Sequence, residues 1–153
     1  MKTVVIGVGN EYRRDDAVGI VLARRLRARG LTKIEVVESS GEGAALMDAW
    51  AGADRVFIID AVQFAGEAGS VRRIAAHERE VPSGFFNYST HAFSVAESIE
   101  LARALDQLPA SLVIYGVEGR NFAMGQGFSP EVEAVIEEVE TRIAAEIAGE
   151  NDA

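Results

Sequence analysis

Residues 3–9 read TVVIGVG, and this stretch decides the fold class. It is a run of β-branched residues, Thr3 to Ile6, followed by Gly7 and Gly9. Such an uninterrupted run is typical of a strand that is buried on both faces, as strands are in parallel sheets covered by helices. The stretch therefore predicts a strand of an α/β protein that ends at the first glycine.

The same pattern recurs along the chain, alternating with helical spacing. Short apolar runs predict further strands at 34–37, 56–59, 71–74 and 112–115. The 71–74 run has a polar pattern, which indicates an edge strand. Apolar residues at helical spacing predict helices at 16–29, 44–50, 93–105 and from 130 onward. This order predicts a three-layer sandwich, in which helices cover both faces of a twisted, mostly parallel sheet of about five strands.

Length and composition narrow the class of protein further. The 153 residues predict a single domain over 1–153, with a frayed tail at 149–153. The 48% of hydrophobic residues exclude a wholly disordered chain. The net charge of -9 opposes binding to nucleic acid or to an anionic membrane. Without a membrane span, a secretory signal or a heptad repeat, the chain is expected to be a soluble, cytoplasmic monomer.

Several kinds of chemistry can be excluded from the motifs. The chain has no cysteine, which excludes disulfides, thiolate zinc sites, iron–sulfur clusters and a cysteine nucleophile. The glycine pair at 7 and 9 lacks the third glycine of a dinucleotide fingerprint, because position 12 is Tyr. No phosphate-binding loop and no Gly-x-Ser-x-Gly elbow occur. His77-Glu78 lacks the second histidine of a zincin, since position 81 is Val.

Polar residues follow the predicted strands. In an open parallel sheet, ligands bind at the carboxyl ends of the strands. Asn10 and the pair Asp15-Asp16 follow the first strand, Asp60 follows the third, and His91 precedes the third helix. Each has a structural alternative: one of the two adjacent aspartates can cap the helix, Asp60 can cap the turn after its strand, Asn10 can hold a tight turn, and His91 can cap or pack. Together, two carboxylates and one imidazole at one edge favour a shared site.

The chemistry of such a site is limited to two kinds. Nitrogen and oxygen donors suit a divalent first-row metal, and three protein ligands leave positions open for substrate or water. Without a metal, two close carboxylates can share a proton and act as acid and base. Glu118 after the last strand is a weaker candidate for the same edge.

Four segments resemble a known family in order and spacing. They are 7–10 (GVGN), 15–19 (DDAVG), 58–61 (IIDA) and 89–91 (STH). They resemble the hydrogenase maturation endopeptidases, which process the large subunit of nickel–iron hydrogenases. The resemblance extends from Lys2 to Ile143 and implies an α/β fold with a twisted central sheet.

The resemblance also implies roles for individual residues. It assigns metal contact, and with it catalysis, to Asp16, Asp60 and His91. The implied substrate is the precursor of the large subunit, whose C-terminal extension is removed only after nickel has been inserted. The implied nickel belongs to the substrate and is not retained by the isolated protein. A site without thiolates should bind nickel only moderately, as a checkpoint requires.

The remaining expectations concern the cleft and the chemistry of cleavage. Asn10 and Gly41 are expected to shape the cleft and contact the substrate. The segment 116–127 is glycine-rich, as in a mobile loop over the substrate tail or in a plain connection. Either the substrate nickel polarises the scissile carbonyl, or Asp16 or Asp60 acts as general base. Two other functions stay open: a non-catalytic module that binds metal or anions, and a small-molecule hydrolase.

Overall fold

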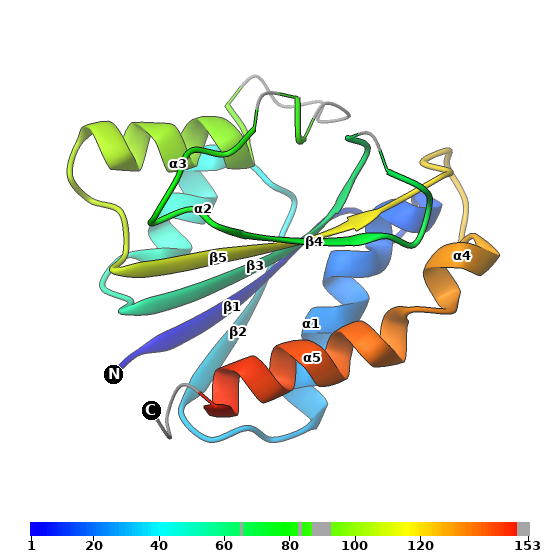
Figure 1. Ribbon diagram of the computed structural model, residues 1–153, viewed down its shortest axis with the longest axis horizontal. Helices are drawn as coiled ribbons and strands as arrows, with labels where there is room; N and C mark the ends of the chain where they lie inside the picture. The colour runs from blue at the N-terminus through cyan, green and yellow to red at the C-terminus, as the bar shows by residue number, and fades with distance from the viewer. Residues whose placement is uncertain (65, 83, 87–92, 150–153) are drawn as a thin grey trace.

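A single sheet organises the protein. The computed structural model describes residues 1–64, 66–82, 84–86 and 93–149, and within them five strands pair in the order β2-β1-β3-β5-β4 (Figure 1). The pairs among the first four strands of this order are parallel, and β4 is antiparallel to β5 at the edge. The strands are β1 (Thr3–Val8), β2 (Ile34–Ser39), β3 (Arg55–Val62), β4 (Val71–Ala75) and β5 (Ser111–Glu118).

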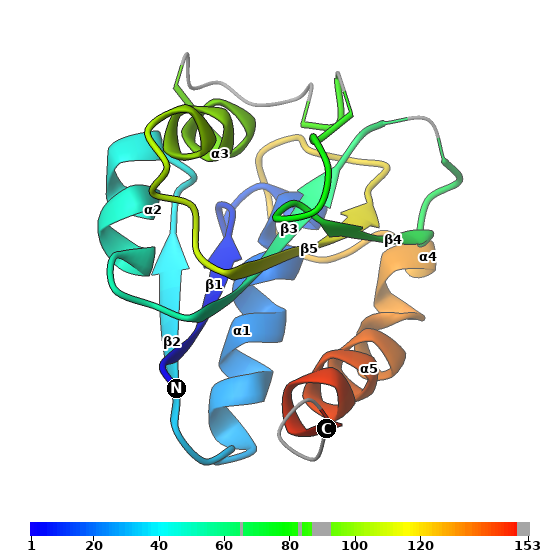
Figure 2. The ribbon, with the colours of Figure 1, turned by 60° about the vertical axis from the view of Figure 1, so that its left-hand side comes forward.

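Helices cover both faces of this sheet. α2 and α3 lie on one face and α1 and α5 on the other, so the predicted three-layer α/β architecture is confirmed (Figure 2). The helices are η1 (Arg14–Ala17), a 3-10 turn, followed by α1 (Val18–Ala28), α2 (Gly43–Trp50), α3 (Val95–Ala104), α4 (Pro130–Glu133) and α5 (Ile136–Gly149). In the described part of the chain, no helix is long and apolar enough to cross a membrane.

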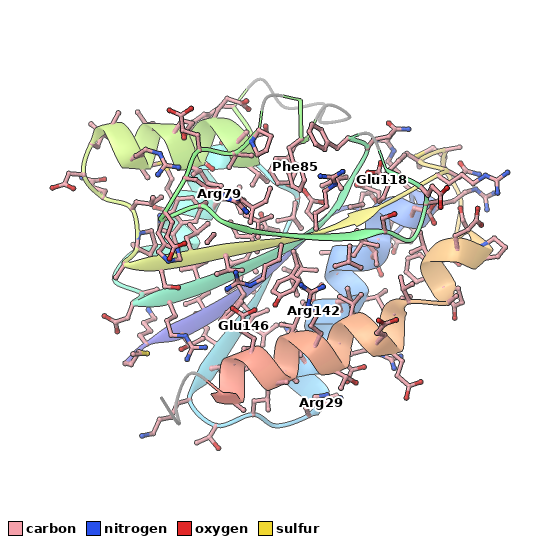
Figure 3. All side chains as sticks on the ribbon, viewed as in Figure 1. Arg29, Arg79, Phe85, Glu118, Arg142 and Glu146 are labelled. Carbon is pink, nitrogen blue, oxygen red and sulfur yellow. The ribbon has the colours of Figure 1, made fainter. Side chains whose placement is uncertain are left out.

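The central strand β3 supplies side chains to both layers. All eight of its residues are buried. Val56, Ile58 and Val62 pack with α2 and α3, whereas the intervening apolar residues pack with α1 and α5. Figure 3 shows the same division, with Phe85 on the α3 side of the sheet and Glu146 on the α5 side. Burial on both faces explains why these strands have continuous rather than alternating apolar sequences.

All five described strands extend beyond the ends predicted from the sequence, and three of them continue past a residue that was expected to end the strand. β1 continues past Gly7 to Val8, β3 continues through Asp60 to Val62, and β5 continues past Gly116 to Glu118. Gly116 lies inside β5 and does not end the strand. Its missing side chain makes room for Phe85, since a β-carbon there would lie 2.7 Å from the ring. A glycine inside a strand here marks a close approach of another group.

The helix starts also differ from the prediction. The first helical segment begins as a 3-10 turn at Arg14, and α1 begins at Val18 with Ala17 as N-cap, so neither Asp15 nor Asp16 caps α1. The last helical segment divides into α4 and α5. Pro130 occupies the first turn of α4 as expected, but the Ser129 hydroxyl donates to Asp15 rather than capping the helix.

Candidate active site

The site begins where β1 and β3 part. β1 pairs with β3 as far as Gly7 and Ile59, and β3 then continues beside β5 alone. Gly19 of α1 packs against this point, since a β-carbon on it would lie 2.3 Å from the carbonyl oxygen of Ile59 and 2.4 Å from that of Val8. The start of α1 therefore lies directly on the carboxyl ends of two parallel strands, where ligands bind in sheets of this kind.

Asp16 is held at this edge by the turn that precedes it. The backbone N–H of Asn10 donates to Oδ2 of Asp16 at 3.0 Å. The Asn10 side chain in turn accepts from the N–H of Tyr12 at 2.9 Å, which closes a tight turn. Asp16 is 6% exposed. The tight turn predicted as a structural alternative for Asn10 is present, and it also positions the predicted ligand Asp16.

Asp60 is a carboxylate in an apolar row. It is 1% exposed, and strand alternation places it on the same face of β3 as Val56, Ile58 and Val62. It pairs with Gly116 of β5, over which Phe85 packs. η1, which carries Asp16, contacts β3. The structure thus brings the elements of two predicted ligands together at one edge of the sheet.

The third predicted ligand, His91, lies outside the described residues, as do Ser89 and Thr90. Where the description resumes, the carbonyl of Phe93 accepts from the N–H of Gly43 at 2.9 Å. Within the described ranges, no three His, Asp or Glu side chains are grouped to hold a metal ion. A three-residue metal site of the predicted kind therefore depends on His91.

Gly41 lies at the same edge as Asn10. It is buried against the side chain of Val8, the last residue of β1. Its N–H donates to Oγ of Ser39 at 3.1 Å, and the carbonyl of Ser39 accepts from Gly9 at 2.9 Å. These bonds join the ends of β1 and β2, so Gly41 and Asn10 lie at the same edge of the sheet, and of the two only Asn10 is seen to contact Asp16 within the described residues.

Asp15 is a structural anchor. It is 0% exposed. It accepts hydrogen bonds from the N–H groups of Arg120, Asn121 and Ser129 at 2.8 to 2.9 Å and from the Ser129 hydroxyl at 2.7 Å. Burial raises the pKa of Asp15, but these four bonds outweigh it and bring the pKa below its usual value. Of the two adjacent aspartates, Asp15 therefore has the structural role, although it does not cap a helix.

The connection after β5 is bound to the connection after β1. Arg13 pairs with Gly125 in a parallel bridge, and Arg13 Nε donates to the carbonyl of Phe122 at 3.1 Å. Glu118 accepts from the N–H groups of Phe64 and Gly66 at 3.0 and 3.1 Å, so its carboxylate orders the connection after β3. These contacts join distant segments, and no local pattern in the sequence indicated them.

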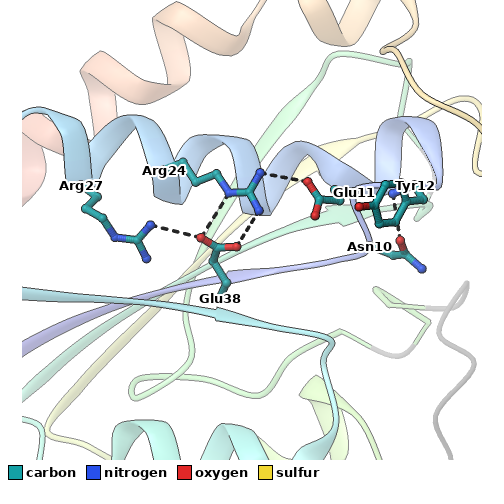
Figure 4. Close-up of polar contacts among 6 residues, drawn as sticks. All are labelled: Asn10, Glu11, Tyr12, Arg24, Arg27 and Glu38. Atoms are coloured by element: carbon teal, nitrogen blue, oxygen red, sulfur yellow. Dashed lines mark hydrogen bonds and ion pairs between the residues drawn. The ribbon is translucent and has the colours of Figure 1, made fainter.

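A charged network borders the turn at Asn10 (Figure 4). Arg24 of α1 donates to Glu11 at 3.0 Å and to Glu38 at 2.9 Å, and Arg27 donates to Glu38 at 3.1 Å. The hydrogen bond from Arg24 is the main cause of the lowered pKa of Glu38. A groove of about 320 Å³ lies between residues 9–12 and 38–40, so it adjoins the residue that holds Asp16.

The fold and the buried carboxylates define an α/β protein with an acidic site at the carboxyl edge of its sheet. A family model described as HycI, hydrogenase maturation protease, matches residues 18–146. The Hydrogenase 2 maturation protease of Escherichia coli K12 is 30% identical over 140 residues, which cover 90% of this chain and 85% of that protein.

Solved structures agree with this match. The hydrogenase maturating endopeptidase HybD from E. coli superposes with a TM-score of 0.81 at 25% identity, covering 97% of this chain and 94% of that one. HybD from Thermococcus kodakarensis shares the fold with a TM-score of 0.69 at 24% identity, covering 98% of each chain. The protein belongs to the hydrogenase maturation protease family, which confirms the resemblance found in the sequence and its class as a peptidase.

Proposed function

We propose that the protein removes the C-terminal extension of a nickel–iron hydrogenase large-subunit precursor after nickel insertion, and that Asp16, Asp60 and His91 contact the nickel of that substrate. One observation supports this most: a buried carboxylate, Asp60, interrupts an apolar row at the edge where Asp16 is also held. Family membership supports the kind of reaction, the burial of Asp60 and the position of Asp16 support the choice of these two residues, and the choice of His91 rests on the resemblance in the sequence.

Asp60 is a buried carboxylate at the edge of the sheet where ligands bind, and this placement suits contact with a cation. A carboxylate removed from water loses several kcal/mol of solvation unless charge or hydrogen bonds compensate. An apolar side chain like those of Val56 and Ile58 could occupy the position of Asp60 without this loss of solvation. A divalent ion carried in by the substrate would favour the charged form of Asp60 and would be attracted to the second carboxylate, Asp16.

The three proposed ligands suit transient contact with a metal better than tight, permanent binding. Two carboxylates and one imidazole provide only oxygen and nitrogen donors, and borderline ions such as nickel are held more firmly where thiolates are added. The chain has no cysteine, so it cannot supply thiolates. We therefore expect the substrate to keep the nickel during cleavage. Nanomolar nickel affinity of the isolated protein, measured by calorimetry, would contradict this part of the proposal.

Cleavage then follows from the position of the nickel. A metal bound near the scissile peptide polarises its carbonyl and lowers the pKa of a bound water. In this proposal Asp16 and Asp60 hold the metal against the carboxyl edge of the sheet, and the turn at Asn10 keeps Asp16 in place. The groove between residues 9–12 and 38–40 is lined by Asn10 and so adjoins the turn that holds Asp16, where we place the extended segment of the substrate.

The test is a cleavage assay followed by mass spectrometry of the large subunit. The wild-type protein should shorten the nickel-loaded precursor and leave the nickel-free precursor intact. Asp16→Asn, Asp60→Asn and His91→Ala should each slow cleavage at least about a hundredfold with unchanged circular dichroism. Normal cleavage by one variant removes that residue from the site. Binding of the precursor without cleavage by the wild-type protein would instead support a non-catalytic module.

A further inference from the structure

Two large apolar side chains are exposed beside the proposed active site. Tyr12, between β1 and η1, is 55% exposed, and Met124, between β5 and α4, is 70% exposed. Both belong to connections at the carboxyl edge of the sheet. The other large apolar residues that are exposed in the described part of the chain are Met1, Leu101 and Leu105.

The backbone brings these two residues together. The N–H of Gly125 donates to the carbonyl of Tyr12 at 2.8 Å, and the N–H of Arg14 donates to the carbonyl of Gly125 at 3.1 Å. The parallel bridge between Arg13 and Gly125 puts Tyr12 and Met124 at adjoining register positions. Figures 1 and 2 both show the connection after β5 running alongside the start of η1.

Hydrogen bonds hold the connection after β1 and the connection after β5 in place. Asp15 binds the segment 120–129 with four hydrogen bonds, and Arg14 Nη1 donates to the carbonyl of Gln126 at 3.2 Å. Arg14 itself has a φ of 48°, a conformation that non-glycine residues adopt only where the surroundings enforce it. The exposure of Tyr12 and Met124 is thus a property of an ordered surface. Apolar side chains presented in this way mark sites of protein–protein contact.

The surface has the composition of a binding hot spot. Tyr and Met are enriched in protein interfaces, and hot-spot side chains are surrounded by polar residues that exclude water. Here the exposed polar residues Glu11, Asn121 and Gln126 lie next to the pair in the same two connections. Tyr12 is also continuous with the active site, because its N–H bonds to Asn10 and the N–H of Asn10 bonds to Asp16.

We infer that Tyr12 and Met124 form a docking surface for the folded body of the large-subunit precursor. The inference rests on the proposed function and names the part of the substrate that binds here. Met124 is 70% exposed, so the partner must supply a hollow to bury its side chain, which a folded domain can do and an extended tail cannot. A body held here would present its C-terminal segment to Asp16.

The test compares two double variants, each of which replaces two exposed large apolar side chains with serine. Tyr12→Ser/Met124→Ser removes the docking surface, and Leu101→Ser/Leu105→Ser removes exposed apolar side chains of α3 and the residue after it, as a matched control. Cleavage of the nickel-loaded precursor is measured against precursor concentration. We expect the first variant to raise KM at least about tenfold with kcat within about twofold, and the control to change neither. Unchanged KM in the first variant would overturn the inference.

A second measurement identifies the occupant. The processed large subunit, which lacks the extension, should inhibit the wild-type protein and should inhibit Tyr12→Ser/Met124→Ser at least about tenfold less well. Equal inhibition of both, or inhibition of neither, would show that the surface does not hold the body of the subunit. Failure of the wild-type protein to cleave the precursor contradicts the proposed function instead, and direct binding of the processed subunit still decides the docking surface.

Discussion

Gly9 lies against the carbonyl group of Asp16: a β-carbon on Gly9 would be 1.9 Å from that oxygen. The φ of Gly9, +150°, is also one that residues with side chains rarely adopt. The carboxylate proposed to read the metal is therefore positioned by a backbone contact that only glycine permits. The second glycine of the Gly-x-Gly at 7–9 therefore permits the close approach of the Asp16 backbone. It does not belong to a dinucleotide fingerprint, because position 12 is Tyr.

Gly9→Ala should displace η1 from the end of β1. Backbone strain and the displaced contacts should lower the free energy of unfolding by about 2–4 kcal/mol. Cleavage of the nickel-loaded precursor should fall by about a hundredfold, because a shift of about 1 Å in a catalytic group has effects of this size. Urea unfolding and the cleavage assay measure both. Gly149→Ala is the control, since a β-carbon there meets nothing within 4 Å. Wild-type cleavage by Gly9→Ala would show that Asp16 is not positioned by this contact.

Asp15→Ala should destabilise the protein. The substitution leaves three backbone N–H groups and one hydroxyl without their acceptor. Unsatisfied buried donors of this kind should cost about 2–4 kcal/mol in the free energy of unfolding. Urea unfolding at neutral pH measures the loss, and the exposed Glu80→Ala serves as control with an expected change below about 0.5 kcal/mol. An Asp15→Ala protein as stable as the wild type would exclude the anchoring role.

Stability should decrease on acidification. The pKa of Asp15 is below its usual value of 3.8 in the folded protein, so the unfolded chain binds more protons at acidic pH. The stabilisation from Asp15 is complete above its usual pKa and is lost as the pH falls through the folded pKa. Glu38, Glu140 and Glu146 have lowered pKa values as well, through hydrogen bonds from arginines that outweigh burial in the last two cases.

The pH prediction is tested by urea unfolding between pH 7 and pH 3. The free energy of unfolding should be nearly constant above pH 5, and each of these carboxylates can contribute a slope of up to about 1.4 kcal/mol per pH unit below it. Asp15→Asn should reduce the slope near pH 4. An identical slope in the wild type and Asp15→Asn would contradict the lowered pKa of Asp15.

Glu118→Gln should separate structure from catalysis. The amide keeps one oxygen acceptor for the N–H groups of Phe64 and Gly66, so about 1–2 kcal/mol of stability should be lost. Cleavage of the nickel-loaded precursor should stay within about threefold of wild type at a temperature where the variant is folded. A loss comparable to that of Asp60→Asn would instead place Glu118 in the reaction.

The fold was predictable because its signals are local. Burial on both faces makes 3–6 and 56–59 uninterrupted apolar or β-branched runs, and parallel strands bring the residues that follow them, Asp16 and Asp60, to one edge. The role of Asp15 was not predictable, because its partners lie 105 to 114 residues away in the sequence. The prediction that Gly116 ends a strand is wrong for a similar reason, because Phe85, which packs against Gly116, comes from another part of the chain.

The most direct test of the central claim is X-ray absorption at the nickel edge of the loaded precursor, freeze-quenched after mixing with the protein. If Asp16, Asp60 and His91 contact the substrate nickel, nitrogen or oxygen ligands should be added to the metal before the extension is released, and Asp60→Asn should reduce this change. A nickel environment that stays the same throughout a mixture undergoing cleavage would contradict the claim.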